Sequence, residues 1–487
     1  MDYAGSLALI APEITLGASG LVLLLVAAWG GDKAARLVGY GSILALFGAG
    51  AMLFPALHDG ASGPDFLAFG ELFRADAFAA FAKALIYLAA IGCLVVAPDY
   101  FERRGAMKAE YPILVLFAAL GMSIMVSAGD FLTLYVGLEL NSLAAYVMAA
   151  FLRNDTRSAE AGLKYFVLGA LASGILLYGI SLLYGFTGHT SFTGVATVLT
   201  GELSTGALFG LIFVLAGLAF KVSAVPFHMW TPDVYEGAPT PVTTFFATAP
   251  KVAAIGLTAR VALEVFGGQA DAWRQIVIFA SLASIIVGAL GAIGQENLKR
   301  LLAYSSINNV GFILLGLAVA TASGASAMLV YLFVYVAMSL GSFVALLMLR
   351  DDEGNLYETF ADISGLSLTR PLIAWSLLLL MFSLAGIPPL LGFYGKFVVF
   401  QATVEAGMVA LGAIAIAASV IGAFYYIKFV KVMFFDEPAG VVTGKSGVGH
   451  WAVLLICAAI ISPLGYLLTP SLVDLADKAA NALFLTL

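Results

Sequence analysis

The chain has 487 residues, of which 62% are hydrophobic and only 11% charged, and its mean hydropathy is +1.01. A soluble domain could not cover so much apolar surface with so few charges, so the composition predicts an all-α polytopic membrane protein surrounded by lipid. The formal net charge of −7 and the lack of a basic tail argue against a nucleic-acid partner.

Apolar stretches long enough to cross a bilayer recur along the whole chain. Since one crossing needs about 20 residues, these stretches correspond to about fourteen helices. The first follows a short N-terminus without a positive region, so we expect a retained span rather than a cleaved signal peptide. The expected spans are 10–29, 36–57, 74–97, 110–128, 130–152, 160–184, 206–230, 241–266, 273–294, 299–319, 325–349, 371–406, 408–435 and 450–470.

The basic residues predict how these spans are oriented. With the N-terminus outside, thirteen lysines and arginines fall in inside loops and flanks, whereas three fall in outside segments. Basic residues concentrate on the inner side of membrane proteins, so this count agrees with the assumed orientation. Both chain termini are therefore expected on the outer side of the membrane.

Two of the expected spans contain internal breaks, at Pro226 and at Pro388-Pro389. Each break can place helix ends, with their partial charges, inside the membrane. The broken spans are five helices apart, and since five is odd, helices four to eight and nine to thirteen are expected to be inverted repeats. The predicted organisation is a three-helix segment (1–109), a first repeat (110–272), a second repeat (273–437) and a C-terminal helix (438–487).

Glu139 and Lys221 are the first candidates for a proton pathway. A charge at bilayer depth costs at least about 2.5–3.5 kcal/mol, so it is retained mainly where it has a task. Lys221 precedes Pro226 by five residues, and Glu139 lies about 14 Å into its span. We expect the two to pair, because each buried charge needs a partner, and moving the pair apart or together would change its proton affinity. A static buried ion pair, or for Glu139 a polar anchor between helices, is the alternative.

Two further lysines lie deep in their spans. Lys251 follows Pro250 and is about 15 Å into its span, so it is the expected next proton carrier; a contact with a lipid headgroup is the alternative. Lys396 follows the second break, as Lys221 precedes the first. We expect it to be the terminal proton donor or acceptor on the outer side, with a purely structural role as the alternative.

Candidate relay groups surround these positions. Lys164 lies near the inner surface, where snorkelling to the interface is an equally simple interpretation. His228 could relay protons between the two lysines of the first repeat, because imidazole titrates near neutrality, or it could be a packing residue. A water wire could be held in the tenth span by Tyr304, Ser305 and Ser306.

The other ionisable residues of the spans receive no pathway role. Three basic residues are expected to reach interfaces or loops: Lys83, Arg260 and Lys428. A solvated loop is expected after the first break, at Asp233, Tyr235 and Glu236. Cys93 and Cys457 are solitary and the four histidines are scattered, so no metal, haem or iron–sulfur cluster is expected in this chain.

Three stretches carry a family resemblance: Lys221–Val242, Leu302–Ile307 and Ala385–Lys396. They resemble the antiporter-like membrane subunits of respiratory complex I, the proton-translocating NADH:quinone oxidoreductase, and the similarity covers nearly the whole chain. The chain is most similar to the N type. The M type would carry a glutamate at Lys396, and the L type continues into a long lateral helix.

The resemblance implies specific roles. Glu139 and Lys221 would form the coupling pair, Lys251 and Lys396 would continue the central polar axis, and Lys164 would belong to the same polar set. NADH, FMN, iron–sulfur clusters and quinone would be bound by other subunits. The partners would be other membrane-arm subunits, including further antiporter-like ones, in a bacterial inner membrane.

One departure from the family pattern concerns the tenth span. Many relatives have Ser-His where this chain has Asn308-Asn309, so any proton path there would need water or the neighbouring hydroxyl groups. A subunit of a multisubunit Na⁺/H⁺ antiporter is the alternative function, because such proteins share the fold. A structural spacer that conducts nothing is the third interpretation.

Overall fold

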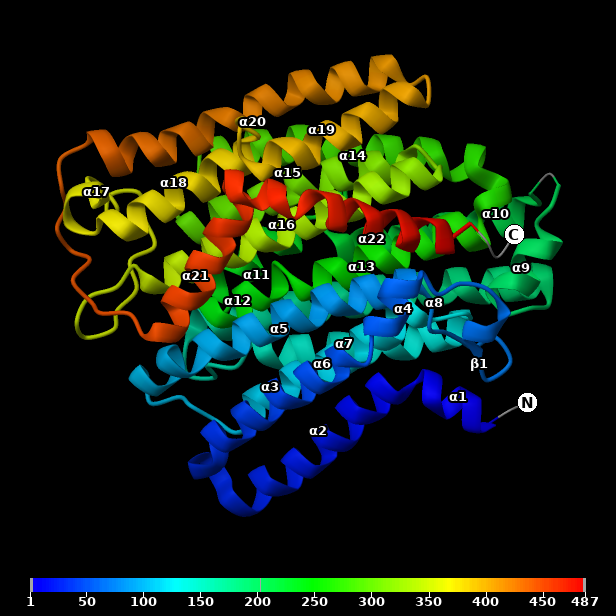
Figure 1. The fold of residues 1–487 in the computed structure, drawn as a ribbon, viewed down its shortest axis with the longest axis horizontal. Helices are drawn as coiled ribbons and strands as arrows, with labels where there is room; N and C mark the ends of the chain where they lie inside the picture. Colours follow the sequence, from blue (N-terminus) through cyan, green and yellow to red (C-terminus); the bar gives the residue numbers. More distant parts are fainter. Residues whose placement is uncertain (1–2, 202, 485–487) are drawn as a thin grey trace.

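The computed structural model describes residues 3–201 and 203–484. Long helices lie roughly side by side in one bundle, with α2 and α3 at one edge and α20 at the other (Figure 1). The first elements are α1 (Tyr3–Leu9), α2 (Ala11–Gly30), η1 (Gly31–Ala34), α3 (Ala35–Ala51), α4 (Phe54–Asp59), η2 (Pro64–Phe66), β1 (Leu67–Ala68), β2 (Phe73–Arg74) and α5 (Ala77–Arg103). The two short strands pair antiparallel.

The two expected repeats and the C-terminal segment supply the remaining elements. The first comprises α6 (Glu110–Ser127), α7 (Phe131–Ala149), α8 (Thr156–Thr187), α9 (Phe192–Val198), α10 (Thr205–Val222), α11 (Trp230–Gly237), α12 (Thr240–Phe246), α13 (Ala249–Arg260), η3 (Val261–Val265) and η4 (Gly267–Gln269). The rest are α14 (Ala270–Ile293), α15 (Leu298–Ala318), α16 (Ala322–Met348), α17 (Leu366–Thr369), α18 (Pro371–Ala385), α19 (Leu391–Glu405), α20 (Val409–Phe435), α21 (Val448–Ile461), η5 (Pro463–Leu467) and α22 (Thr469–Ala482).

The polytopic all-α prediction is confirmed. Within the described residues, 11 helical segments are long and apolar enough to cross a membrane, and two shorter apolar helices, α18 and α21, accompany them. The first segment contains the separate helices α2 and α3, and each broken span counts once, so the expected fourteen crossings are all accounted for. The loops at Gly105, Asn154 and Gly354 line one cavity at one end of the bundle, together with Arg103, Arg104, Lys108 and Arg153; this end is here called the basic end.

Both predicted breaks are present. Helix α10 ends at Val222, where Ser223 takes a left-handed conformation (φ 65°), and α11 resumes at Trp230. Helix α18 ends at Ala385 before Gly386 (φ 85°). The peptide bonds before Pro226 and Pro389 are both cis. The positive φ favours glycine at position 386, and a Cβ there would also lie 3.1 Å from Lys396 Cδ, so that the lysine would have to shift.

Two further interruptions were not predicted. The eighth span stops at Phe246 and restarts at Ala249, with Thr248 between the two pieces, and a π-helical turn (η3) then ends it. The last span, expected to be continuous, stops at Ile461 and continues through η5 into α22. Pro463 explains the second interruption, since proline cannot continue a helix hydrogen-bond ladder.

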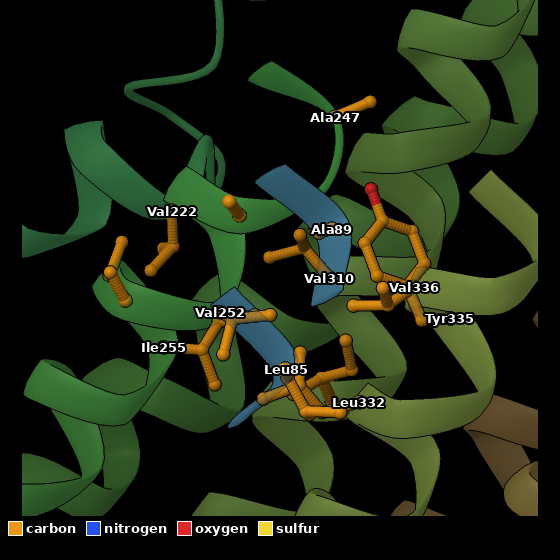
Figure 2. Packing of buried hydrophobic residues seen from close by; sticks show 14 of the residues in the cluster. Leu85, Ala89, Val222, Ala247, Val252, Ile255, Val310, Leu332, Tyr335 and Val336 are labelled. Atoms are coloured by element: carbon orange, nitrogen blue, oxygen red, sulfur yellow. The ribbon is translucent and has the colours of Figure 1, made fainter. Parts of the chain in front are cut away.

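The centre of the bundle is an apolar core. Side chains from α5, α13, α15 and α16 meet there, as Figure 2 shows for Leu85, Val252, Ile255, Val310 and Leu332. The peripheral helices instead expose large apolar side chains, as a lipid-facing surface requires. The central helices therefore enclose whatever polar groups they carry.

Candidate functional site

Lys251 belongs to α13, and its side chain reaches the C-terminal end of α10. Its Nζ donates to the carbonyl of Val222 at 3.0 Å and also to the Ser223 hydroxyl. That hydroxyl in turn accepts from Thr231 Oγ1 of α11 at 2.6 Å. The end of a helix carries a partial negative charge, so the first break creates a binding place for an ammonium group. Lys251 occupies it with only 1% of its surface exposed.

Lys396 has the same relation to the second break. Its Nζ donates to the carbonyls of Leu384 at 3.0 Å and Ala385 at 3.3 Å, the last residues of α18. Ser419 of α20 accepts a longer bond at 3.4 Å. Each broken span thus ends its first half at a buried lysine, and each ammonium group is held by helix-end carbonyls rather than by a carboxylate.

Glu139 and Lys221 lie near each other without forming the expected direct pair. Lys221 Nζ donates at 2.7 Å to Ser142 Oγ, three residues after Glu139 on α7. In the described part of the chain no hydrogen bond or ion pair joins Glu139 to Lys221, and Glu139 Oε1 is buried without a partner. Both side chains are half-buried. Ser142 therefore holds the lysine within reach of the carboxylate but apart from it.

Aromatic rings complete the surroundings of the three ammonium groups. The rings are electron-rich on their faces and stabilise a cation where water is scarce. The distances from Nζ to ring centre are 5.8 Å for Lys221 and Tyr146, 5.5 Å for Lys251 and Trp230, 6.0 Å for Lys251 and Tyr235, and 4.6 Å for Lys396 and Phe312.

A hydroxyl network fills the region around Ser305 and Ser306. Ser306 Oγ lies 2.7 Å from Tyr335 Oη, and Ser305 Oγ lies 2.5 Å from Tyr426 Oη. Asn309 joins the second pair, because its Nδ2 donates to Tyr426 Oη at 3.4 Å. Its Oδ1 accepts from a further buried hydroxyl, Tyr331 Oη, at 2.6 Å.

The tyrosines of this network were missed by sequence reasoning. Tyr331 and Tyr335 are one helical turn apart on α16, so the sequence could have placed them on the same face of that helix. This spacing does not predict which side chains they bond. Tyr304 instead places its ring against Gly291. Asn308 donates to the Ile285 carbonyl at 2.7 Å, outside the network. Of the Asn-Asn sequence, Asn309 is thus the residue that contacts hydroxyl groups of α16 and α20.

His228 does not connect the lysines directly. It lies half-buried in the turn after Pro226, and its Nδ1 is buried without a hydrogen-bond partner among the described residues. Pro226 itself is exposed. The relay predicted for His228 is therefore not formed by a direct contact in this conformation.

The loop predicted after the first break is wrong, because the helix resumes there as α11. Tyr235 is fully buried and donates to the Phe246 carbonyl at 3.0 Å. Asp233 accepts from Lys164 at 2.8 Å and from Arg300 at 2.6 Å. Lys164 is thus fixed at the basic end, where Glu160 also pairs with it at 2.8 Å.

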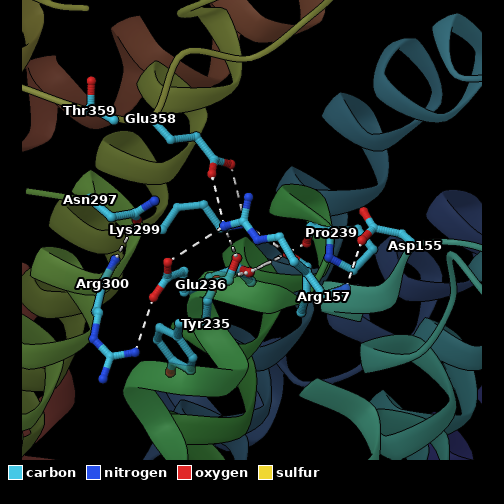
Figure 3. Close-up of polar contacts among 12 residues, drawn as sticks. Asp155, Arg157, Tyr235, Glu236, Pro239, Asn297, Lys299, Arg300, Glu358 and Thr359 are labelled. Atoms are coloured by element: carbon cyan, nitrogen blue, oxygen red, sulfur yellow. Dashed lines mark hydrogen bonds and ion pairs between the residues drawn. The ribbon is translucent and has the colours of Figure 1, made fainter. Parts of the chain in front are cut away.

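This ionic network extends across the basic end of the bundle (Figure 3). Glu236 accepts from Arg300 at 3.1 Å and lies 3.7 Å from Arg157. Glu358, from the loop after α16, lies 3.5 Å from both Arg157 and Lys299. The network joins the two expected repeats through residues that are far apart in the sequence.

Two of the unassigned basic residues are buried, contrary to prediction. Arg260 is 0% exposed and Lys83 2% exposed, because each side chain points into the bundle rather than along it. Arg260 pairs with Asp76, and Lys83 pairs with Glu13. Lys428 behaves as predicted: it is half-buried and lies 3.5 Å from Glu296.

Two large cavities adjoin the site. One, of about 700 Å³, lies between α19 and α20 and extends from Lys396 past Gln401 to Glu405, the last residue of α19. The other, of about 1300 Å³, opens at the basic end and has Tyr146 in its wall. Within residues 3–201 and 203–484, no group of three or more His, Cys, Asp or Glu side chains could hold a metal ion.

Comparison with known proteins places the chain in a family of ion-translocating membrane subunits. Residues 128–422 match the family described as NADH:quinone oxidoreductase/Mrp antiporter, TM. NADH-quinone oxidoreductase subunit N of Erythrobacter litoralis is 70% identical over 485 residues, which cover 100% of both chains. The chain therefore belongs to the NADH:quinone oxidoreductase/Mrp antiporter family, on the branch of the N subunits.

Solved structures share the fold. A chain of respiratory complex I from Thermus thermophilus with bound Aureothin is 31% identical, with a TM-score of 0.80 over 95% of this chain and 99% of that one. A chain of the Mrp complex from Dietzia sp. has a TM-score of 0.84 at 23% identity, over 99% of this chain and 98% of that one. The second similarity concerns the fold alone.

Proposed function

We propose that this chain is a membrane-arm subunit of a bacterial NADH:quinone oxidoreductase and translocates protons through Lys221, Lys251 and Lys396. The redox chemistry, with NADH, FMN, iron–sulfur clusters and quinone, belongs to other subunits. The chain responds to that chemistry by changing which group holds the proton. The names of its relatives and the buried lysines both support this role.

The observation that carries the proposal is the placement of Lys251 and Lys396 at equivalent helix ends, with a hydroxyl network between them. An amine held by carbonyl oxygens is stabilised when protonated and can release its proton when that contact is changed. Tyr235 lies beside Lys251. Two hydrogen-bonded groups lie beyond it: the Ser306–Tyr335 pair, and Asn309 with its hydroxyl partners. Ordered water would complete the steps between these side chains.

A matched contact supports the assignment of residues 110–272 and 273–437 as inverted repeats. Gly121 of α6 faces the backbone nitrogen of Asn141, which a Cβ would approach to 2.6 Å. Gly288 of α14 faces the backbone nitrogen of Asn308 in the same way, at 2.5 Å. Each pair is separated by the same number of residues, so α6 and α7 correspond to α14 and α15. Glu139 then corresponds in position to Ser306.

The cavities support a direction for the pathway. The cavity beside Lys396 extends away from the basic end, toward Glu405. Since the basic end is expected to face the cytoplasm, Lys396 is the group that exchanges protons with the outer side. In this orientation we expect both chain termini on the outer side as well. Lys164 and the ionic network around Asp233 lie at the cytoplasmic end and position α11 beside the axis.

The flank formed by α7 and α8 is the proposed contact with a neighbouring membrane-arm subunit. Glu139 is only half-buried there, and a carboxylate facing lipid would be costly. Large apolar side chains surround it on the exposed faces of the two helices: Leu132, Val136, Leu143, Leu163, Phe166 and Leu171. A partner subunit that covers this flank would enclose Glu139 and could act on Lys221 through it.

Inverted membrane vesicles test the function. NADH oxidation should drive proton uptake, and Lys251→Met should reduce the protons moved per electron, whereas Lys428→Met, at a half-buried surface lysine, should not. An unchanged ratio for Lys251→Met in an assembled complex would refute the proposal and favour a structural spacer. Proton movement driven by a sodium gradient without NADH would favour a cation/proton antiporter instead.

A further inference from the structure

The N-terminal segment contains a buried ion pair that lies apart from the lysine axis. Lys83 of α5 is 2% exposed, and Glu13 in the first turn of α2 is 7% exposed. Lys83 Nζ lies 2.6 Å from Glu13 Oε1. Charges inside membrane helices are costly and mark functional positions more often than structural ones. The proposed proton pathway does not use either residue.

The pair belongs to a short chain of hydroxyl groups. Glu13 Oε1 also accepts from Ser123 Oγ at 2.6 Å, and Ser123 Oγ lies 2.7 Å from Tyr87 Oη. The second oxygen of Glu13, Oε2, is buried and has no hydrogen-bond partner among the described residues. A buried carboxylate oxygen without a donor is unfavourable unless it gains a proton or a water molecule. Glu13 Oε2 would therefore be stabilised by either a proton or a water molecule.

A cavity lies beside the pair, on the side of Lys83. It has a volume of about 160 Å³, enough for about five water molecules at liquid density. Its ionisable lining residues are Lys83 and Asp76. The rest of its wall is apolar and comes from α1, the start of α2, the end of α3, α4, η2 and the start of α5. All these elements meet at the end of the bundle opposite the basic loops.

Asp76 connects the cavity to the eighth span. It accepts from Arg260 Nη1 and Nη2 at 2.9 and 2.8 Å, and Arg260 also donates to Glu264 at 2.5 Å. Arg74 lies 3.0 Å from Glu264 and completes the cluster. Of this cluster Asp76 lines the cavity, while Arg74, Arg260 and Glu264 lie behind it; on the other side Lys83 lines the cavity, and Glu13 and Tyr87 lie behind Lys83. In this cluster Asp76 and Glu264 lie against arginines, whereas Glu13 lies against a lysine, whose ammonium group can pass a proton to it.

We propose that Glu13 and Lys83 form a proton-exchange site that opens through this cavity to the side of the membrane opposite the basic loops. When the proton moves from Lys83 Nζ to Glu13 Oε1, an N–H bond breaks and an O–H bond forms, and the ion pair becomes a neutral pair. The net charge is unchanged, so apolar surroundings allow both states. The neutral amine of Lys83 can then accept a proton from hydronium in the cavity, and the reverse step returns it.

Infrared spectroscopy of the purified complex tests the site independently of proton pumping by the lysine axis. Acidification should produce a carboxylic-acid carbonyl band that shifts in D₂O and is missing in Glu13→Gln. If that variant does not assemble, Glu13→Asp should move the band instead of removing it. A static ion pair gives no band that depends on Glu13 at any pH at which the complex is intact, and that result would overturn the proposal.

The route through the cavity has its own matched pair of variants. Ala80 lines the cavity, whereas Ala84, one helical turn further along α5, does not. Ala80→Val should slow deuterium exchange at the Glu13 band at least tenfold, because the added methyl groups displace water from the cavity. Ala84→Val should leave the exchange rate unchanged. Equal rates in the two variants would refute this cavity as the route.

Discussion

Replacing Arg260 by methionine should loosen the junction between the eighth span and the N-terminal segment. Arg260 is 0% exposed and makes four bonds: two to Asp76, one to Glu264 at 2.5 Å and one to the Val126 carbonyl at 2.9 Å. Without it, Asp76 would lose the arginine that binds both of its oxygens, and Glu264 would keep Arg74 at 3.0 Å. Breaking a buried pair by removing one partner costs about 3–5 kcal/mol. Local opening of this region should therefore become two to four orders of magnitude more frequent, at about tenfold per 1.4 kcal/mol.

Hydrogen–deuterium exchange of the assembled complex measures this opening directly. The reporter is the π-helical segment Val261–Val265, which carries Glu264 and follows Arg260 immediately. Lys428→Met is the control, because the Lys428–Glu296 pair at 3.5 Å lies at the surface and a surface pair is worth about 0–1 kcal/mol. If Arg260→Met accelerates exchange in Val261–Val265 no more than Lys428→Met does, the cluster does not hold the junction and the reasoning fails.

Two further substitutions test the central helices. Tyr426→Phe removes a hydroxyl that bonds Ser305 and Asn309, so it should lower the number of protons moved per electron in inverted vesicles. Tyr425→Phe is the control and should leave that number unchanged, because the Tyr425 hydroxyl has no hydrogen-bond partner among the described residues. Equal effects of the two variants would exclude the network from the pathway. Gly288→Ala should prevent close packing of α14 on α15, because its Cβ would lie 2.5 Å from a backbone nitrogen, and native gels should show loss of the assembled complex. Normal assembly would show that the two helices can separate at little cost.

The positions of the spans and of the two proline breaks could be predicted from the sequence. A membrane helix needs about 20 apolar residues and proline cannot continue the hydrogen-bond ladder, so both features are local. The interruption between α12 and α13 was missed, although Pro250 carries the same local signal in the middle of the expected eighth span. In the structure Pro250 lies in the first turn of α13, where its missing N–H costs no hydrogen bond.

The lysines at bilayer depth were also identified from the sequence, but not their partners. Lys221 was expected to pair with Glu139, and the structure gives it Ser142 instead. The ammonium groups of Lys251 and Lys396 were expected to be proton carriers, and the structure adds that each is held by the end of a half-helix. A residue's depth follows from its place in a span, whereas its contacts depend on how neighbouring helices pack.

Composition and local pattern thus determined that this is a polytopic membrane protein with buried, titratable lysines beside two breaks. Tertiary structure decided which charges are enclosed. Arg260 and Asp76 are 184 residues apart, and Glu13 and Lys83 belong to different helices, so no local pattern pairs them. The physical reason is that the sequence does not fix the direction in which a side chain points. A basic residue within a span can point toward an interface or into the bundle, and only the packing of sequence-distant helices fixes which of the two it does.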